Sequence, residues 1–368
     1  MKRKIIFLGP LPPPYMGPSL ATEVLLNSKL KDEFDLIHLD TSDHRDLKTL
    51  GAVDFWNLYL PLKFYFNLIK LIFTKKPDFV YIPISQTTLG YLKDSIFIII
   101  SKLFRRKVVC HLRGGNFQNW LNAASSATNW YVIKVHSLVD AQIVLGENLR
   151  YLFKDIVPDE KIFVVPNGKD IYNPKYDQHN ENIKVLFLAN MKRTKGVLDV
   201  FYAIPQVYGK FPNVEFLFGG DWNEEDVKKE METYLLKHPN LPIKLLGMVC
   251  GKEKYDLLNT ADIFVFPTYY PPEGHPWVII EAMASQLPII TTDHAAISES
   301  VENNINGFLV EKRNSDDIAE KLMILLRNNK LRKNMGLESL KLYQEKFTEE
   351  KMIQRISLVF NSIFECEK

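Results

Sequence analysis

The sequence predicts an α/β protein built from two doubly wound parallel sheets. The chain has 368 residues, more than one hydrophobic core usually organises, so we expect about two domains. Apolar runs with strand character alternate with helical patterns along most of the chain, as a doubly wound parallel sheet requires. A polar, turn-forming stretch at residues 170–182 has no apolar periodicity and divides this alternation into two halves.

The first half contains six short apolar runs that are expected to form the first sheet. In chain order they are KIIFLG (4–9), FDLIHLD (34–40), DFVYIPI (78–84), KVVCHL (107–112), AQIVLG (141–146) and IFVVPNG (162–168). The loop after the first run passes Gly9 and Gly17 before a predicted helix begins at about Ser19. Gly17 would allow an anion to approach the free N–H groups of that helix N-terminus, although the loop taken alone reads as a stiff turn.

The second half contains five further strand-like runs, separated by helical patterns. They are IKVLFLAN (183–190), VEFLFGG (214–220), IKLLGMV (243–249), ADIFVFP (261–267) and LPIITTD (287–293). We therefore predict a Rossmann-like first domain at 1–172, a linker at 173–182 and a Rossmann-like second domain at 183–349. The C-terminal helix, about 350–368, is expected to pack back on the first domain. In such sheets ligands bind beyond the carboxyl ends of the strands, so two facing domains define a cleft.

Composition and cysteine usage are those of an ordinary enzyme of a reducing compartment. Hydrophobic residues make up 46% of the chain and charged residues 24%, without the bias of a disordered or fibrous protein. The three cysteines, Cys110, Cys250 and Cys366, lack the close spacings of a zinc site or a disulfide framework. The apolar runs at 5–8 and 95–104 are too short for a signal peptide and a spanning helix, so we expect a cytoplasmic protein.

Charge is distributed unevenly between the halves. Residues 1–175 contain 23 Lys and Arg against 16 Asp and Glu, whereas residues 176–368 contain 23 against 28. Residues 56–76 interleave Lys63, Lys70, Lys75 and Lys76 with aromatic and aliphatic side chains and contain no acid. A basic, aromatic helix suits an anionic membrane surface. The alternative is a core helix with a solvated edge.

Two glutamates eight positions apart are the main candidates for chemistry. Glu273 lies in the loop TYYPPEGHP (268–276) after a predicted strand, and Glu281 lies about one turn into the helix that follows. A carboxylate accepts two hydrogen bonds and can hold a vicinal diol, and a helix N-terminus favours negative charge. Lys192, Arg193 and Lys195 follow another predicted strand, where they suit a polyanion; a merely solvated basic loop is the alternative. Together these features predict a receptor for a nucleotide sugar.

The segment from Glu273 to Glu281 resembles the E-x7-E motif of retaining glycosyltransferases of family 4, which have the GT-B fold. The resemblance extends over nearly the whole chain. It includes PNGKD (166–170), KG (195–196), GGD (219–221), LLG (245–247), ADIFVFPT (261–268) and ESVENNINGFLV (299–310). It implies two Rossmann-like domains that face a central cleft.

The resemblance also implies a donor site and a reaction. Glu273 would hold the hydroxyls of the donor sugar, Glu281 the nucleotide ribose, and Lys195, helped by Arg193, the diphosphate. The other donor-binding residues that it implies are Gly17, Asn190, Gly247, Met248, Gly274, His275, Pro276 and Trp277. The reaction would move a hexose-type sugar from a UDP- or GDP-sugar to a glycan or lipid-linked saccharide, with retention of configuration. We expect the protein to act in polysaccharide biosynthesis in the cytoplasm, as a peripheral protein on the inner face of the membrane.

No cofactor, no metal and no nucleic-acid partner are expected. No D-x-D motif stands at a strand end, and a basic turn with a helix N-terminus can stabilise a leaving diphosphate without a cation. A Rossmann oxidoreductase is disfavoured because no glycine-rich dinucleotide turn is followed by an acid about 20 residues later. The remaining alternative is an inactive glycosyltransferase-like subunit that acts as a membrane or assembly scaffold.

The chain departs from the family pattern at three places that keep this alternative open. Ala189 and Asn190 stand where the family usually has a Gly-Arg pair, and Met16 precedes Gly17 where a glycine pair is common. Arg113 stands where a histidine followed by glycine is often found, with His111 two residues earlier on the same strand face. We assign His111 and Arg113 to the acceptor side.

Overall fold

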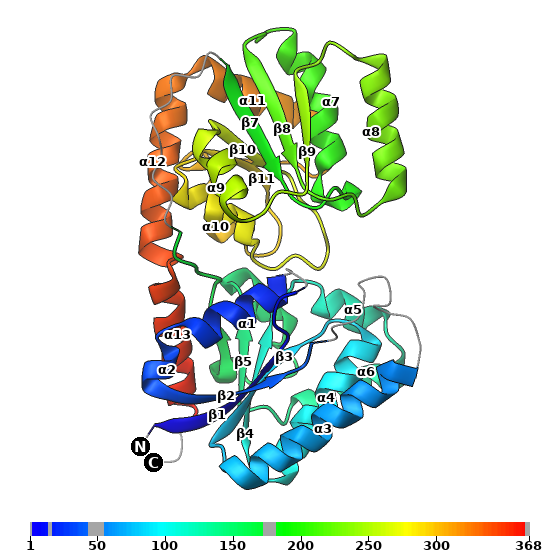
Figure 1. Ribbon diagram of the computed structural model, residues 1–368, viewed down its shortest axis with the longest axis vertical. Coiled ribbons are helices and arrows are strands. Elements are labelled where there is room, and N and C mark those ends of the chain that lie inside the picture. Colours follow the sequence, from blue (N-terminus) through cyan, green and yellow to red (C-terminus); the bar gives the residue numbers. More distant parts are fainter. Residues whose placement is uncertain (1, 14–16, 43–54, 172–181, 365–368) are drawn as a thin grey trace. The chain divides into compact units, whose positions relative to one another are not determined.

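The computed structural model describes residues 2–13, 17–42, 55–171 and 182–364 (Figure 1). For residues 55–58 it describes the backbone only. Met16 and all but the last residue of the predicted linker lie outside the described residues. The chain divides into two compact units. The first unit comprises Met1–Asn167 and Glu349–Lys368, and the second comprises Gly168–Thr348.

The first unit contains a six-stranded parallel sheet in the order β2-β1-β3-β4-β5-β6. Its strands are β1 (Arg3–Gly9), β2 (Phe34–Asp40), β3 (Phe79–Ile84), β4 (Lys107–Leu112), β5 (Ala141–Val144) and β6 (Ile162–Val164). Each corresponds to one of the six runs predicted from the sequence. The central strands β1, β3 and β4 are mostly buried and apolar, as parallel strands between two helix layers usually are, whereas the edge strand β2 is partly exposed and carries polar residues.

Seven α-helices of the described residues flank this sheet (Figure 1). They are α1 (Gly17–Asn27), α2 (Leu30–Glu33), α3 (Phe55–Lys75), α4 (Thr88–Leu103), α5 (Phe117–Ala123), α6 (Ser126–His136) and α13 (Glu349–Ser362). Phe7, Tyr81 and Val109 share a buried cluster with Ile356 and Phe360, so α13 completes the core of the first unit. The helix α4 contacts β3 and β4 and packs against α3 and α6.

The second unit contains a parallel sheet in the order β12-β11-β10-β7-β8-β9. Its strands are β7 (Ile183–Leu188), β8 (Val214–Gly219), β9 (Ile243–Gly247), β10 (Ile263–Phe266), β11 (Ile289–Thr292) and β12 (Gly307–Val310). The sequence predicted the first five of these strands. It did not predict β12, a strand of four residues that follows a polar turn. The strand order reverses between β7 and β10, and ligands bind at such a switch point.

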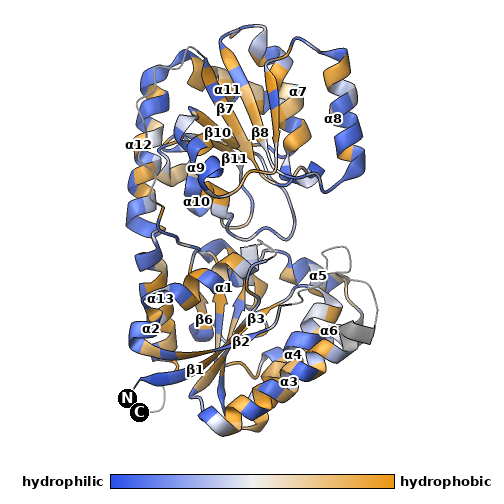
Figure 2. Ribbon diagram, viewed as in Figure 1, coloured by the Kyte–Doolittle hydropathy of each residue, from blue (hydrophilic) through white to orange (hydrophobic). Residues whose placement is uncertain are grey.

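One hydrophobic core holds the second unit together. The helices of the second unit are α7 (Val197–Tyr208), α8 (Glu225–Lys237), α9 (Gly251–Thr260), α10 (Trp277–Ala284), α11 (Ser315–Arg327) and α12 (Asn329–Lys346). The strands β7 and β8 are hydrophobic along most of their length, whereas α8 and α12 carry many hydrophilic residues (Figure 2). Across the described parts of both units, no helix combines the length and apolarity needed to cross a membrane.

A histidine is buried in the helix layer of the first unit. His136, on α6, is 0% exposed. Its Nε2 donates to Oε1 of Gln142 at 2.8 Å, its Nδ1 lies 3.1 Å from the Tyr91 hydroxyl, and its ring stacks on Phe153. Burial lowers the pKa of His136 to about 4, because the charged imidazolium would lose its hydration. The ring is therefore neutral in the folded protein at neutral pH.

We expect the free energy of unfolding to fall as the pH is lowered from about 6.5 to about 4. In that window the unfolded chain binds a proton at His136 and the folded chain does not, so acid favours unfolding. The full loss attributable to His136 is about 3 kcal/mol. His136→Gln should flatten the pH profile of urea unfolding by that amount, whereas His238→Gln, at an exposed histidine of the second unit, should not. Parallel profiles for His136→Gln and the unchanged protein would contradict this assignment.

Candidate functional site

Two loops of the second unit meet at the carboxyl edge of the sheet, where β7 and β10 are neighbours. The loop after β7 contains the short 3-10 helix η4 (Arg193–Lys195), and the loop after β10 covers residues 267–276. The N–H of Tyr269 donates to the carbonyl of Thr194 at 2.8 Å. Gly196 has φ +79°, and a Cβ there would lie 2.4 Å from the carbonyl oxygen of Pro267. The close contact of the two loops therefore requires glycine at position 196.

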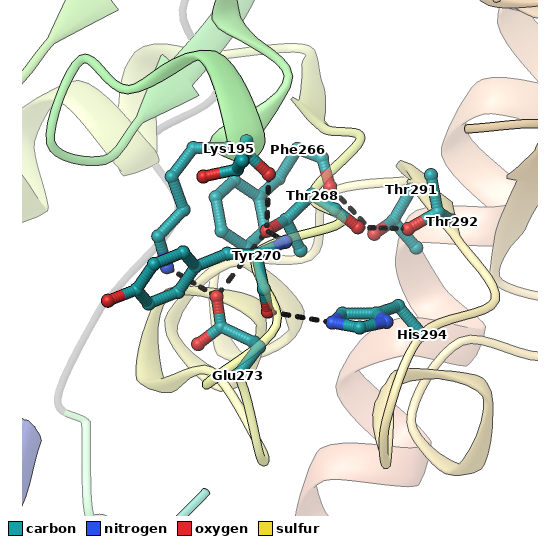
Figure 3. Close-up of polar contacts among 9 residues, drawn as sticks. Lys195, Phe266, Thr268, Tyr270, Glu273, Thr291, Thr292 and His294 are labelled. Atoms are coloured by element: carbon teal, nitrogen blue, oxygen red, sulfur yellow. Dashed lines mark hydrogen bonds and ion pairs between the residues drawn. The ribbon is translucent and has the colours of Figure 1, made fainter. Parts of the chain in front are cut away.

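An ion pair between Lys195 and Glu273 joins the two loops (Figure 3). The two side chains are only 16% and 13% exposed. The hydroxyl of Thr268 lies 3.5 Å from the same carboxylate oxygen. The Lys195 ammonium lies 4.6 Å from the ring centroid of Tyr270, a cation–π distance. The pair is mostly shielded from water, and its attraction is accordingly stronger than that of a surface pair.

Side chains from β11 fix the backbone of the loop that carries Glu273. The Thr291 hydroxyl donates to the carbonyl of Phe266 at 2.7 Å, and the Thr292 hydroxyl donates to the carbonyl of Thr268. His294 Nε2 donates to the carbonyl of Tyr270 at 2.7 Å (Figure 3). Burial, with smaller contributions from neighbouring lysines, lowers the pKa of His294. A neutral His294 thus holds the loop without adding charge beside Lys195.

Glu281 and Lys254 form a second lysine–glutamate pair, which joins α10 to α9. Glu281, on α10, is 4% exposed, and its Oε1 lies 2.5 Å from Nζ of Lys254 on α9. An ionised carboxylate at that depth needs a partner, because removing an unpaired charge from water costs several kcal/mol. Each glutamate of the motif therefore has its own lysine.

The residues between the two glutamates are held by contacts within the second unit. The carbonyl of Gly274 accepts from the N–H of Ala296 at 3.0 Å. The side chain of His275 is buried, with Nε2 2.6 Å from the Ser300 hydroxyl. Pro276 caps α10, and Trp277 is its first residue. This segment is fixed in place by its own hydrogen bonds.

The other predicted residues of the second unit lie along the same edge of the sheet. Gly247 ends β9 with φ +71°, and a Cβ there would meet nothing within 4 Å. Met248, next to it, is 73% exposed, and Asn190, after β7, is exposed as well. These positions leave open space at the carboxyl end of β9, of the kind that an approaching ligand needs.

Arg193 is paired with two carboxylates of α8. Its Nη2 contacts the carboxylates of Asp226 at 3.2 Å and Glu230 at 2.7 Å, both on α8. Its backbone N–H donates to Glu224 at 2.9 Å. The hydrogen bonds with Glu230 and Asp226 raise the pKa of Arg193. Its charge is thus compensated on α8, and Lys195 is the member of the basic trio that reaches Glu273.

The predicted residues of the first unit form a separate group. Gly17 begins α1, and a Cβ at this glycine would meet nothing within 4 Å. His111 lies near the end of β4 and Arg113 directly after the strand. Both are linked to Tyr81 on β3, since the Tyr81 hydroxyl lies 2.7 Å from His111 Nδ1 and accepts from Arg113 at 3.2 Å.

Sequence reasoning missed four residues that support the two glutamates: Lys254, Thr268, Tyr270 and His294. Thr268 and His294 lie two residues beyond the ends of β10 and β11, so the rule that ligands bind beyond strand ends would have found them. Lys254 lies on a polar helix with other charged residues. No sequence pattern distinguishes it from its exposed neighbours.

Comparison with known proteins finds glycosyltransferases that are similar to part of this chain. Residues 169–341 match the family described as Glycosyl transferases group 1. The chain is 28% identical over 237 residues to the Capsular polysaccharide biosynthesis glycosyltransferase CapM of Staphylococcus aureus. It is 29% identical over 236 residues to the Poly(ribitol-phosphate) alpha-N-acetylglucosaminyltransferase of the same species, strain COL. These matches cover 60% and 63% of this chain.

The chain spans about half to three fifths of the length of these curated relatives, 61% of CapM and 46% of the second enzyme. Among solved structures, that of Anabaena Alr3699/HepE in complex with UDP-glucose has a TM-score of 0.75 and covers 98% of this chain and 99% of that one. Its sequence identity of 19% means that the likeness concerns the fold. The predicted GT-B fold, with two parallel six-stranded sheets, is confirmed.

We expect the substitution Lys254→Met to destabilise the second unit by about 1–3 kcal/mol, because it leaves the Glu281 carboxylate buried without its partner. Glu281→Gln in the same background should recover most of this loss, since a neutral amide needs no cation. Urea unfolding of the two single variants and the double variant measures the coupling energy. Losses that simply add, within about 0.5 kcal/mol, would show that the two side chains do not stabilise each other.

Proposed function

We propose that this chain, whose residues 169–341 form a glycosyl transferases group 1 domain, is a retaining glycosyltransferase of family 4. It would transfer a hexose-type sugar from a nucleoside diphosphate sugar to a hydroxyl of a glycan or lipid-linked saccharide. The observation that carries the proposal is the pair of lysine–glutamate contacts at the switch point of the second sheet. The relatives named for capsular polysaccharide and poly(ribitol-phosphate) support a glycan acceptor, and HepE with UDP-glucose supports a UDP-sugar donor.

The two pairs divide the work of donor recognition. Glu281, held by Lys254, would accept hydrogen bonds from the ribose hydroxyls. Lys195 would neutralise the diphosphate, and Glu273 would accept hydrogen bonds from the sugar. Lys195 and Glu273 form an ion pair with each other. Donor binding would therefore break this pair, because Lys195 would move toward the diphosphate. Glu273 would then be free to accept hydrogen bonds from sugar hydroxyls.

The transfer step requires no nucleophile from the protein. The bond between the anomeric carbon and the diphosphate oxygen breaks, and the diphosphate leaves with the electron pair. The acceptor oxygen bonds to the anomeric carbon on the same face, and its proton passes to the leaving phosphate. A double displacement would need two carboxylates about 5–5.5 Å apart across the sugar, which the ribose role of Glu281 precludes. Lys195 would stabilise the charge on the leaving group without a metal ion.

We further propose that the outer surface of α3, α4 and α6 in the first unit docks on an anionic membrane. Leu62, Phe66 and Phe73 on α3, Leu103 on α4 and Trp130 on α6 are large apolar side chains exposed to solvent. Exposed lysines alternate with them on and just after α3, at positions 63, 70, 75 and 76. The helices α3 and α6 contain no Asp or Glu, and the single acid of α4, Asp94, is buried. Apolar area and uncompensated positive charge suit a bilayer with anionic lipids.

We expect Lys195→Ala and Glu281→Ala each to weaken binding of the free nucleoside diphosphate about 10- to 100-fold, the usual effect of losing a hydrogen bond to a charged group. Glu273→Ala should mainly impair recognition of the sugar and transfer. Lys252→Ala, at an exposed lysine of α9, is the matched control. Calorimetry in excess chelator measures these affinities. Unchanged affinity in both Lys195→Ala and Glu281→Ala would contradict the donor site, and loss of all binding on chelation would contradict metal independence.

The membrane surface predicts salt-sensitive binding to vesicles that contain anionic lipid. Each lysine near such a surface contributes about 1 kcal/mol, and the attraction decays within a Debye length. The variant with Lys63, Lys70, Lys75 and Lys76 changed to glutamate should remain in the supernatant when vesicles are sedimented at low salt. A control variant makes the same change at Lys229, Lys237, Lys330 and Lys333, exposed lysines of the second unit. Equal sedimentation of both variants would rule out docking through α3.

A further inference from the structure

A cation at the carboxyl edge of the first sheet has only neutral partners. Arg113 directly follows β4 and is partly buried. Its Nη1 donates to Oδ1 of Asn167 at 3.1 Å and its Nη2 to the Tyr81 hydroxyl at 3.2 Å. Arg150, in the same unit, has Asp159 at 2.8 Å, whereas no carboxylate of the described residues pairs with Arg113. A guanidinium has five N–H donors, so Arg113 retains donors as well as charge for a further partner.

A buried histidine beside Arg113 has a nitrogen without a partner. His111 is 1% exposed, and no described residue makes a hydrogen bond with its Nε2. Burial and the neighbouring Arg113 lower the pKa of His111 well below its usual value, so the ring is neutral. Its two nitrogens therefore differ, one carrying a proton and the other a lone pair.

The Tyr81 hydroxyl decides which nitrogen carries the proton. Its oxygen accepts a hydrogen bond from Arg113, and its single proton faces Nδ1 of His111 at 2.7 Å. Nδ1 is then the acceptor, and the ring proton lies on Nε2. The unpartnered Nε2 is consequently a donor, and a buried donor without an acceptor is unfavourable. The Arg113 guanidinium and the His111 ring both lie within 3.2 Å of the Tyr81 hydroxyl oxygen. Each of the two side chains therefore has an N–H donor left for an acceptor.

The core of the first unit holds this arrangement rigidly. Tyr81 is 1% exposed and stacks on Phe7 of β1, with ring centroids 4.1 Å apart and an interplanar angle of 17°. It also meets the rings of His111 and Phe360 edge-on. The side chain of Asn167, which holds the other arm of Arg113, is buried as well. Because the N–H groups of Arg113 and His111 are already held in place, binding a hydrogen-bond acceptor requires no further loss of side-chain entropy.

We propose that Arg113 and His111 bind an anionic group, a phosphate or a carboxylate, on the sugar acceptor. The proposal rests on the proposed function and narrows its acceptor to a charged glycan or phosphorylated saccharide. A planar guanidinium and an N–H donor match the several oxygens of such a group, and a bidentate contact discriminates it from a hydroxyl. In a purely structural role, by contrast, Arg113 would only bridge Tyr81 and Asn167.

The test compares charged and neutral sugars as ligands of the full-length protein. We expect methyl glucuronide and glucose 6-phosphate to bind at least 10-fold more tightly than methyl glucoside, because a hydrogen bond to a charged group is much stronger than one to a hydroxyl. Arg113→Gln should remove this preference, Arg113→Lys should retain part of it, and the control Arg150→Gln should leave it unchanged. An unaltered preference in Arg113→Gln, with the protein still folded by circular dichroism, would overturn the proposal.

A second titration separates this inference from the proposed function. Arg113→Gln should bind the nucleoside diphosphate as well as the unchanged protein does, because Lys195 and Glu281, which are proposed to hold the diphosphate and the ribose, both lie in the second unit. A loss of nucleoside diphosphate affinity in Arg113→Gln would assign the anion to the donor and overturn the acceptor proposal. Failure of the unchanged protein to bind any nucleoside diphosphate would instead contradict the proposed function, whatever the result with charged sugars.

Discussion

The pairing of each motif glutamate with a lysine is the constraint on which the rest of the proposed site depends. Glu281 is 4% exposed, and a carboxylate at that depth is tolerated only with a partner. Lys254 supplies that partner from α9, and Lys195 does the same for Glu273 across two loops. The carboxylates are therefore paired and oriented before any ligand arrives. On the proposed function, a diphosphate competes with Glu273 for Lys195, which couples phosphate binding to the freeing of a sugar acceptor group.

The sheet topology determines why these particular residues meet. Because the strand order reverses between β7 and β10, the loops that follow these two strands leave in different directions around one opening. Gly196 allows the first loop to touch Pro267, and the threonines of β11 hold the second loop by its carbonyls. A side chain at position 196 would separate the loops and with them Lys195 and Glu273. The ion pair is thus a consequence of backbone geometry that one glycine permits.

The sequence predicted the strands better than it predicted the contacts. Eleven of the twelve strands are apolar runs between turn residues, and this local pattern is sufficient to find them. The strand β12, GFLV at Gly307–Val310, was not predicted. Glu273, Glu281 and Lys195 could be named from the spacing of the motif. The partners Lys254 and Tyr81, and the α8 carboxylates that hold Arg193, could not, because each contact joins residues far apart in the chain and depends on packing.

The uneven charge of the two halves has a structural counterpart. Residues 1–175 contain 23 Lys and Arg against 16 Asp and Glu, and residues 176–368 contain 23 against 28. In the second unit three cations near the proposed donor site, Lys195, Lys254 and Arg193, have acidic partners. In the first unit Arg113 has neutral partners, and α3 carries lysines on a helix without an acid. A positive charge without an internal partner attracts an external one. On the two proposals, the excess charge of the first half serves anionic ligands outside the chain, whereas Lys195 and Lys254 stay paired with glutamates until a donor binds.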